Sequence, residues 1–321
     1  TSILDMACKN CKYDMLEVLV ENGVECSGGK TIWHQLATNK TKYNGAELEL
    51  LERIPVDVNK KCNKGLTALH VSSKFCSMSV AEIVLKKGAN LNITDEEGNS
   101  PLHFASESNE VNLDMIKMFL AKGINVNAQN KNGTTALQIA CRNNDYELTE
   151  LLLGSGASIN INDKHNKNVL HYASESKKNN RDIIKLLHEK NIGVNVQDKY
   201  GTTALQFACL EGVYENAKIL LYFRASVNIK DENNNNALHY AIKSGRNNQD
   251  IIQLLIDNGI DLNTRNKNGT TALHLACLEG INANVQMLLD SGTLINIMDK
   301  DQNNALHYAS ESMNNNVHVM K

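Results

Sequence analysis

The stretch ALHYASES, residues Ala305–Ser312, recurs in this chain of 321 residues as VLHYASES at Val169–Ser176 and as PLHFASES at Pro101–Ser108. Its leucine belongs to a series spaced by 68 residues: Leu102, Leu170, Leu238 and Leu306. A second phrase, TALQ or TALH, gives an interleaved series with the same spacing: Leu69, Leu137, Leu205 and Leu273. Together these anchor leucines advance by 33 and 35 residues alternately. A period of this length predicts a solenoid, in which each repeat buries its apolar face against its neighbours.

The same frame extends upstream, through TIWHQLA around Trp33 and SILDMA around Leu4. We therefore expect one repeat domain over residues 1–321, with nine to ten repeats. Its expected parts are a partial first repeat at 1–28, a degenerate repeat at 29–63, regular repeats with 33/35 alternation at 64–303, and a truncated last repeat at 304–321. Because the chain begins at Thr1 without Met and its last repeat is incomplete, we expect a fragment of a longer protein.

Each anchor is preceded, two residues earlier, by a residue that suits a helix N-cap. These residues are Ser2, Thr31, Thr67, Ser100, Thr135, Asn168, Thr203, Asn236, Thr271 and Asn304. Pro101 follows one of them, where the first turn of a helix tolerates proline. A first short helix is therefore predicted at every anchor.

A second apolar run, such as DIIKLL at 182–187, has helical spacing and predicts a second helix in each repeat. It should end where left-handed backbone is favoured. The residues there are Gly23, Gly88, Gly123, Gly156, Gly259 and Gly292, with Asn191 in one repeat. Pro55 and Arg224 occupy this slot in two copies, and there we expect the helix to close differently.

This order of helix, turn, helix and extended turn resembles the ankyrin repeat. The family phrase D-x-x-G-x-T-P-L-H-x-A is matched by DEEGNSPLHFA at Asp95–Ala105 and by NKNGTTALHLA at Asn266–Ala276. Its ending L-L-x-x-G-A-x-V-N is matched by KKGANLN at Lys86–Asn92. The resemblance covers essentially the whole chain, and it implies an all-α repeat solenoid of stacked helix-turn-helix units with short β-hairpin fingers. Three repeats lack the turn glycine of the phrase and carry Asn166, Asn234 and Gln302 there.

Seven of the ten histidines directly follow an anchor: His34, His70, His103, His171, His239, His274 and His307. Gln138 and Gln206 fill the same slot elsewhere. Glutamine cannot replace a general base, but both side chains can hydrogen-bond to turn backbone. This substitution favours a structural role over catalysis or metal binding. The aromatic residues that follow are expected to be packed rather than to stack on a ligand: Phe104, Tyr172, Tyr240 and Tyr308.

The pair Cys8 and Cys11 in CKNC has the spacing of a zinc or redox pair, and Cys26, Cys62 and Cys76 are possible further ligands. However, one slot four residues after the anchor holds Cys8, Cys141, Cys209 and Cys277. A thiol that recurs at a buried slot behaves as a small hydrophobic side chain. We therefore expect no metal and no cofactor. Eight cysteines without disulfide spacing favour a reducing, intracellular location, the cytoplasm with the nucleus as alternative.

Charge and hydropathy exclude several classes of partner. Nucleic-acid binding needs a basic surface, and a net charge of -3 with a pI near 6.4 does not indicate one. No apolar run approaches the length of about 18 residues that a membrane span needs, so direct membrane insertion is not expected. The chain also shows no P-loop, no Gly-x-Ser-x-Gly and no acid/base pair, and is not expected to be an enzyme.

The alternation of 33 and 35 arises between the paired helices, in ESNEVNLD, ESKKNNRD, KSGRNNQD and ESMNNNVH. One interpretation is a longer polar loop with a small entropic cost; another is a second contact ridge. Polar turns after the second helix carry a recurrent asparagine. The family resemblance implies that these side chains occupy a position that an oxygen-dependent asparaginyl hydroxylase can modify; the alternative is that they only stabilise the turn. They are Asn127, Asn160, Asn195 and Asn228.

The resemblance implies a non-catalytic scaffold that binds another protein on a concave face, and a monomeric array. The alternative is a recognition or regulatory arm of a larger machine, such as an ion channel, a toxin or a ubiquitin-ligase adaptor. A small-ligand sensor has only Lys199 and Tyr200 in its favour.

Transferred position by position, the family's partner contacts fall on hairpin tips and on first helices. The tips are Lys64, Glu96, Glu97, Lys131, Asn132, Lys164, His165, Lys199, Tyr200, Glu232, Asn233, Lys267 and Asn268. The helix positions are Lys74, Phe75, Glu107, Arg142, Asn143, Glu175, Leu210, Glu211, Lys243, Leu278 and Glu279. These side chains carry both signs of charge, which argues against a purely acidic or basic partner. Leu210 and Leu278 either contact the partner or pack against the neighbouring repeat.

Overall fold

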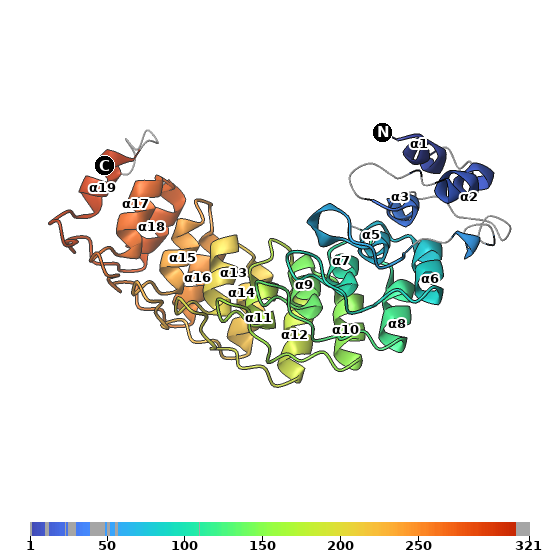
Figure 1. The fold of residues 1–321 in the computed structure, drawn as a ribbon. Helices are drawn as coiled ribbons and strands as arrows, with labels where there is room; N and C mark the ends of the chain where they lie inside the picture. The colour runs from blue at the N-terminus through green and yellow to red at the C-terminus, as the bar shows by residue number, and fades with distance from the viewer. Residues whose placement is uncertain are drawn as a thin grey trace. The chain divides into compact units, whose positions relative to one another are not determined.

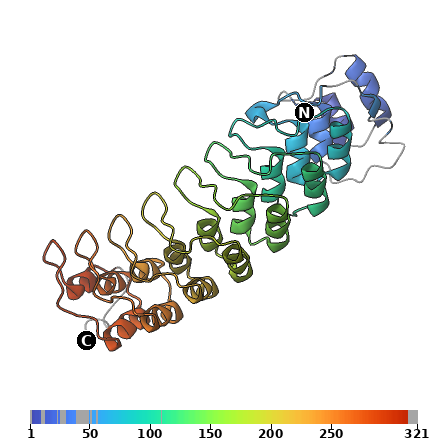
Figure 2. The same ribbon diagram turned by 90° about the horizontal axis from the view of Figure 1, so that it is seen from below.

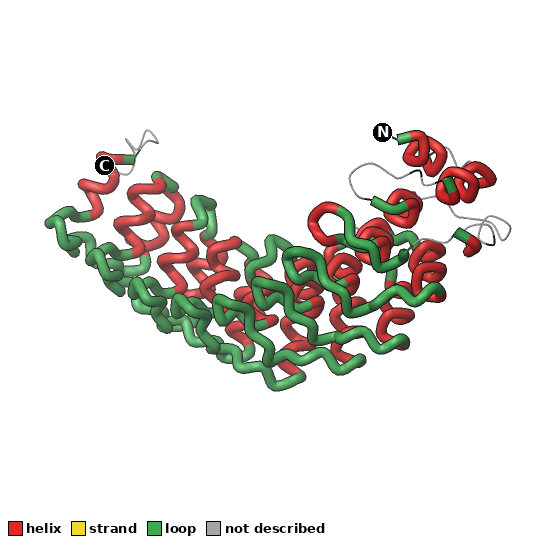
Figure 3. The backbone as a smooth tube through the Cα atoms, viewed as in Figure 1, coloured by secondary structure: helices red, strands yellow, loops and turns green. Residues whose placement is uncertain are grey.

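The computed structural model describes residues 2–9, 13–22, 24, 30–38, 49, 52–54, 57–108 and 110–312 (Figure 1). These residues form helices joined by turns (Figure 3). The all-α repeat architecture expected from the sequence is thereby confirmed. Among the described residues, no helix is both long enough and apolar enough to cross a membrane.

The chain groups into two compact bodies, which we describe separately. The first body comprises residues 1–140 and 147–158, and the second comprises residues 141–146 and 159–321. The helices of the first body are α1 (Ile3–Lys9), α2 (Tyr13–Glu21), α3 (Ile32–Thr38), α5 (Ala68–Phe75), α6 (Met78–Lys86), α7 (Pro101–Glu107) and α8 (Leu113–Ala121). Two helices contribute residues to both bodies: α9 (Ala136–Asn143) and α10 (Tyr146–Gly154). The second body contains α11 (Val169–Ser174), α12 (Arg181–Glu189), α13 (Ala204–Glu211), α14 (Tyr214–Tyr222), α15 (Ala237–Lys243), α16 (Gln249–Asp257), α17 (Ala272–Glu279), α18 (Asn282–Asp290) and α19 (Ala305–Glu311).

Within each body the helices form two layers, with the long turns between repeats projecting as fingers to one side (Figure 2). First helices contact the first helices of adjacent repeats, as α13 contacts α15 and α15 contacts α17. Second helices do the same in the chain α12, α14, α16 and α18. The anchor leucines lie between them: Leu69, Leu238 and Leu273 are at most 2% exposed. Burial against neighbouring repeats is therefore the main stabilising contribution.

The predicted N-caps are confirmed at the first helices. Thr203 Oγ1 accepts the backbone N–H of Gln206, and Asn236 Oδ1 accepts that of His239, both at 3.4 Å or less. Pro101 occupies the first turn of α7, as expected. These caps satisfy backbone donors that the first turn of a helix leaves without a partner.

The left-handed ends of the second helices are also confirmed, with φ of 88° at Gly88 and 63° at Asn191. The expectation of a different closure at Arg224 is wrong. Arg224 has φ 66°, and the next N–H, that of Ala225, donates to Leu220 O at 3.0 Å. The geometry of the turn, rather than the residue type, therefore decides the conformation. Pro55 and Gly23 lie outside the described residues.

Two kinds of repeat alternate. In one kind the paired helices are separated by two residues, as at 212–213 between α13 and α14. In the other, longer loops cover 108–112, 175–180 and 244–248. The expected position of the extra residues is thereby confirmed. In the last copy, ESMNNNVH, residues 313–318 lie outside the described part of the chain.

The expected β-hairpin fingers are turns rather than strands in the part of the chain that is described. The two sides of each finger are joined by a backbone hydrogen bond such as that from Asn130 N–H to Thr134 O, at 3.0 Å. The described residues contain one isolated antiparallel bridge, between Gln197 and Thr203. The β character of the fingers is therefore not confirmed.

Candidate functional site

The recurrent histidines link each first helix to the finger of the next repeat. In α5, His70 Nδ1 accepts the backbone N–H of Thr67 at 3.0 Å, and His70 Nε2 lies 3.1 Å from Asn99 O. Because Nδ1 accepts a hydrogen bond from this N–H, it carries no hydrogen itself, and Nε2 of the neutral ring is protonated and donates to the carbonyl. Burial lowers the pKa of His70 to about 4, so the ring is neutral at pH 7.

The same link recurs along the chain. The Nε2-to-carbonyl pairs are His34–Leu66, His103–Thr134, His171–Thr202, His239–Thr270 and His274–Asn303, at 2.8 to 3.3 Å. Gln206 makes both bonds in its repeat, accepting Thr203 N–H and donating to Asn235 O at 3.0 Å. The predicted structural role of this slot is confirmed.

The tyrosines after these histidines hold the base of the finger. Tyr240 Oη donates to Asp231 Oδ2 at 2.8 Å, and Asp231 Oδ1 accepts the N–H groups of Asn233 and Asn235. Burial raises the pKa of the Tyr240 hydroxyl, so it stays protonated. The same tyrosine–aspartate bond joins Tyr172 to Asp163 and Tyr308 to Asp299. These aromatic side chains are packed, as predicted, and each also donates this bond.

Successive fingertips are joined by backbone hydrogen bonds. In the first body Glu96 N–H donates to Lys64 O and Lys131 N–H to Glu97 O, at 2.8 to 3.0 Å. The second body continues the pattern with three donor–acceptor pairs: Lys199–His165, Glu232–Tyr200 and Lys267–Asn233. In each body these bonds hold successive tips at a fixed spacing.

The structure places most of the predicted contact residues at the surface. Exposed are Lys64, Lys74, Phe75, Glu96, Glu97, Glu107, Lys131, Asn132, Arg142, Lys164, His165, Lys199, Tyr200, Glu232, Asn233, Lys243, Lys267, Asn268 and Leu278. Half-buried are Asn143, Glu175, Leu210, Glu211 and Glu279. The two leucines of the CLEG copies therefore differ: Leu278 is exposed, whereas Leu210 is partly covered.

Two groups of the predicted residues are brought together. At the tips, the rings of His165 and Tyr200 are stacked with centroids 5.9 Å apart. In the first body, Lys74, Phe75 and Glu107 line a hollow of about 510 Å³ at the ends of α5 and α7. Its remaining walls come from Cys76, Phe104, Ser108 and Glu110. Both groups combine an aromatic side chain with exposed charge.

The cysteines behave as small buried side chains. Cys141, Cys209 and Cys277 are at most 3% exposed, and burial raises the pKa of the Cys277 thiol to about 11. Such thiols are protonated at pH 7 and unsuited to bind metal. Among the described residues no group of three His, Cys, Asp or Glu side chains could hold a metal ion. Cys11 and Cys26 lie outside that part of the chain.

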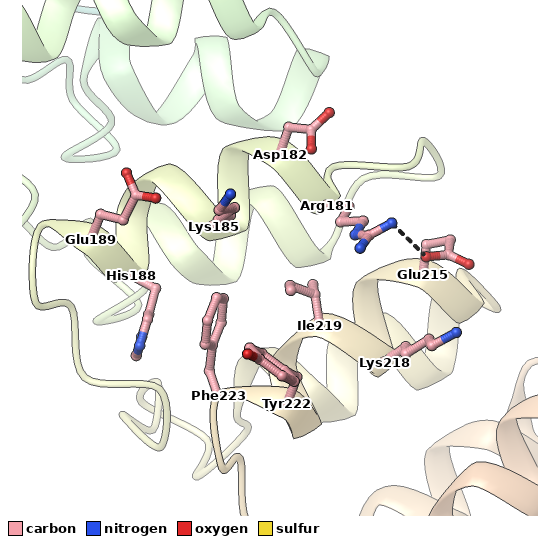
Figure 4. A pocket seen from close by; sticks show the side chains of 10 residues that line it. All are labelled: Arg181, Asp182, Lys185, His188, Glu189, Glu215, Lys218, Ile219, Tyr222 and Phe223. Atoms are coloured by element: carbon pink, nitrogen blue, oxygen red, sulfur yellow. Dashed lines mark ion pairs between the residues drawn. The ribbon is translucent and has the colours of Figure 1, made fainter.

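A groove that the sequence reasoning missed lies between α12 and α14, with a volume of about 490 Å³ (Figure 4). Its aromatic side chains are Tyr222 and Phe223, and the ring of His188 stacks on Phe223. A comparison of the same slot in the other repeats would have singled these residues out.

The sequence matches a family model described as ankyrin repeats (3 copies), over residues 34–130, 110–198, 170–266 and 246–321. A curated relative is a protein of Fowlpox virus (strain NVSL) described as an ankyrin repeat protein. The two are 34% identical over 120 residues, which is 36% of this chain and 35% of the viral protein. The match thus spans about a third of the length of that relative.

Proposed function

Because this chain belongs to the family of ankyrin-repeat proteins, whose repeats are generally non-catalytic protein–protein interaction modules, we propose that it is a scaffold that binds a protein partner through its fingertips and first helices. The observation that carries the proposal is the row of bonded tips. Fixed backbone lowers the entropic cost of binding, because the tip side chains are presented without first being ordered.

The chemistry of the tips indicates what kind of partner fits. In the second body the aromatic pair His165 and Tyr200 lies beside Lys164 and Lys199, while Glu232 follows on the next tip. Tyr200 is 49% exposed although it is aromatic. Exposed aromatic side chains with charged neighbours are typical of residues that dominate binding energy. The proposed partner therefore presents an apolar group flanked by charges of both signs.

The test is affinity capture from a lysate with the wild-type chain and with the double variant Tyr200→Ala, Lys199→Glu. We expect the variant to lose the specifically captured protein while its circular dichroism and melting temperature stay unchanged, since both side chains are exposed. Lys117→Glu, on the exposed face of the second helix α8 and outside the fingertips and first helices, is the control and should retain capture. Capture that survives in the double variant would exclude these tips as the binding surface.

A further inference from the structure

The groove between α12 and α14 lies on second helices, whereas the proposed scaffold surface uses fingertips and first helices. Its floor consists of Ile219, Tyr222 and Phe223, and the ring of His188 stacks on that of Phe223 with centroids 3.7 Å apart and an interplanar angle of 15°. Tyr222 is 78% exposed and packs edge-on against Phe223, with centroids 5.4 Å apart. A large aromatic surface is therefore left in contact with solvent.

The repeats themselves show that the fold does not need these aromatic residues. The slot of Tyr222 is filled in equivalent repeats by Lys86, Gly154 and Asp290. The slot of Phe223 is filled by Lys87, Ser155 and Ser291. Polar or small residues are thus the norm at this end of the second helix. Two adjacent aromatic residues, one of them almost fully exposed, need an explanation other than folding.

The charges around the floor are arranged unequally. Arg181 Nη1 is 3.8 Å from Glu215 Oε2 across one end of the groove, so these two charges offset one another. The carboxylates of Asp182 and Glu189 point away from the aromatic side chains, and Lys185 lies between these two residues along α12 (Figure 4). Lys185 has no ion-pair partner among the described residues within 4.0 Å. The lining holds three basic side chains, Arg181, Lys185 and Lys218, and three acidic ones, Asp182, Glu189 and Glu215, so Lys185 offers a positive contact in a groove without net charge.

We propose that this groove is a second docking site, which binds a short linear segment of a partner protein. The segment inserts one large apolar side chain between Ile219, Tyr222 and Phe223 and places a carboxylate against Lys185. The volume of about 490 Å³ lies in the range of pockets that enclose a compact ligand group. A second copy of the chain fits less well, because a stable dimer takes about 20 to 30 residues from each side and the groove is lined by residues of only two helices.

The test uses a displayed library of random 12-residue peptides, selected on the wild-type protein and counter-selected on Tyr222→Lys. This substitution, like Phe223→Lys, installs the residue that α6 carries in the same slot, so the variants should fold. We expect enriched peptides with one large apolar residue and a nearby Asp or Glu. A fluorescent peptide of the consensus should bind each aromatic variant at least tenfold more weakly in an anisotropy titration, and Lys185→Glu several-fold more weakly.

Tyr200→Ala is the control: it alters a fingertip and should leave the affinity of the peptide unchanged, which separates this site from the proposed scaffold surface. Unchanged melting temperatures of the variants show that folding is not the cause of lost binding. The proposal is overturned if no peptide is enriched, or if the consensus peptide binds Phe223→Lys and Lys185→Glu as tightly as the wild type. It is also overturned if the wild type alone sediments as a dimer that Tyr222→Lys abolishes, because a second copy would then cover the groove.

Discussion

At the scale of single residues, the buried histidines make stability depend on pH. Burial holds the pKa of His70 and of His239 at about 4 in the folded chain, against an ordinary value of 6.5 in the unfolded one. Between these values the unfolded state binds more protons, so stability falls as pH decreases from about 6.5 towards 4. Each of these two histidines should therefore lower the free energy of unfolding at pH 5.5 by about 1 kcal/mol relative to neutral pH.

The double variant His70→Gln, His239→Gln tests this dependence. Glutamine already makes both bonds at Gln206, so the variant should fold at pH 7.5. Its free energy of unfolding in urea should decrease less than that of the wild type between pH 7 and pH 5. His165→Gln, which removes a histidine from an exposed fingertip, is the control for the loss of a histidine as such. Identical slopes for the double variant and the wild type would contradict the assignment.

Sequence reasoning identified the histidine slot because glutamine replaces histidine in it, which separates hydrogen bonding from proton transfer. It missed the tyrosine–aspartate bonds, although an aspartate precedes each of Tyr172, Tyr240 and Tyr308 by nine residues. A pairing nine residues apart follows neither the helical nor the strand period. The bond depends on how the finger folds back on its helix, and the spacing alone does not show that.

At the scale of elements, the long loop at 175–180 is held by the next repeat. Asn216 of α14 is fully buried; its Nδ2 donates to Lys178 O at 3.0 Å, and its Oδ1 accepts Asn180 N–H at 2.7 Å. Asn284 of α18 bonds to Arg246 O in the same way, at 2.9 Å. Sequence patterns place Asn216 on an amphipathic helix but cannot show that a loop from another repeat lies over it.

Asn216→Ala should therefore destabilise the chain by about 1 to 3 kcal/mol, because the buried N–H of Asn180 and the part-buried carbonyl of Lys178 lose their partner. Hydrogen exchange should become faster at Asn180 before it does so in α13. Asn258→Ala, which removes an exposed asparagine, is the control and should change stability little. Equal effects of the two substitutions on stability would argue against a stabilising role for the hydrogen bonds between Asn216 and the loop.

The left-handed end of α14 gives a stabilising substitution. Arg224 is exposed and has φ 66°, a conformation that costs a residue with a Cβ about 1 kcal/mol or more. Arg224→Gly should thus raise the free energy of unfolding by about 0.5 to 1 kcal/mol, after the greater freedom of glycine in the unfolded chain is allowed for. The opposite substitution, Gly259→Arg, at a residue with φ 77°, should lower the free energy of unfolding by a similar amount. Thermal denaturation of both variants measures the pair, and a destabilised Arg224→Gly would contradict the argument.

At the scale of the molecule, each repeat gains its stability from neighbours on both sides. The anchor Leu306 is 53% exposed, whereas Leu238 is completely buried. In a protein that consists of residues 1–321 alone, amide hydrogen exchange should accordingly be fastest before about Asn59 and after about Asn304, since the repeats at its two ends would then have a single stacking interface. Uniform protection from end to end would be inconsistent with nearest-neighbour stabilisation.

The alternation of the two kinds of repeat determines how many residues can be deleted from this chain without breaking the contacts between repeats. Lys178 Nζ donates to Asn143 O, and Arg246 makes the equivalent bond to Glu211 O, each from a long loop to the preceding first helix. Deleting residues 168–235, one full period of 68, would put Arg246 opposite Asn143 and leave Asn284 on its loop. Deleting the 33 residues 203–235 would set two long loops side by side without Asn216 between them. Deleting the 35 residues 168–202 would instead remove the long loop to which Asn216 bonds. The smallest segment that can be removed without breaking these contacts is therefore a pair of consecutive repeats. The variant that lacks 68 residues should be expressed as folded, monodisperse protein, and the variants that lack a single repeat should not.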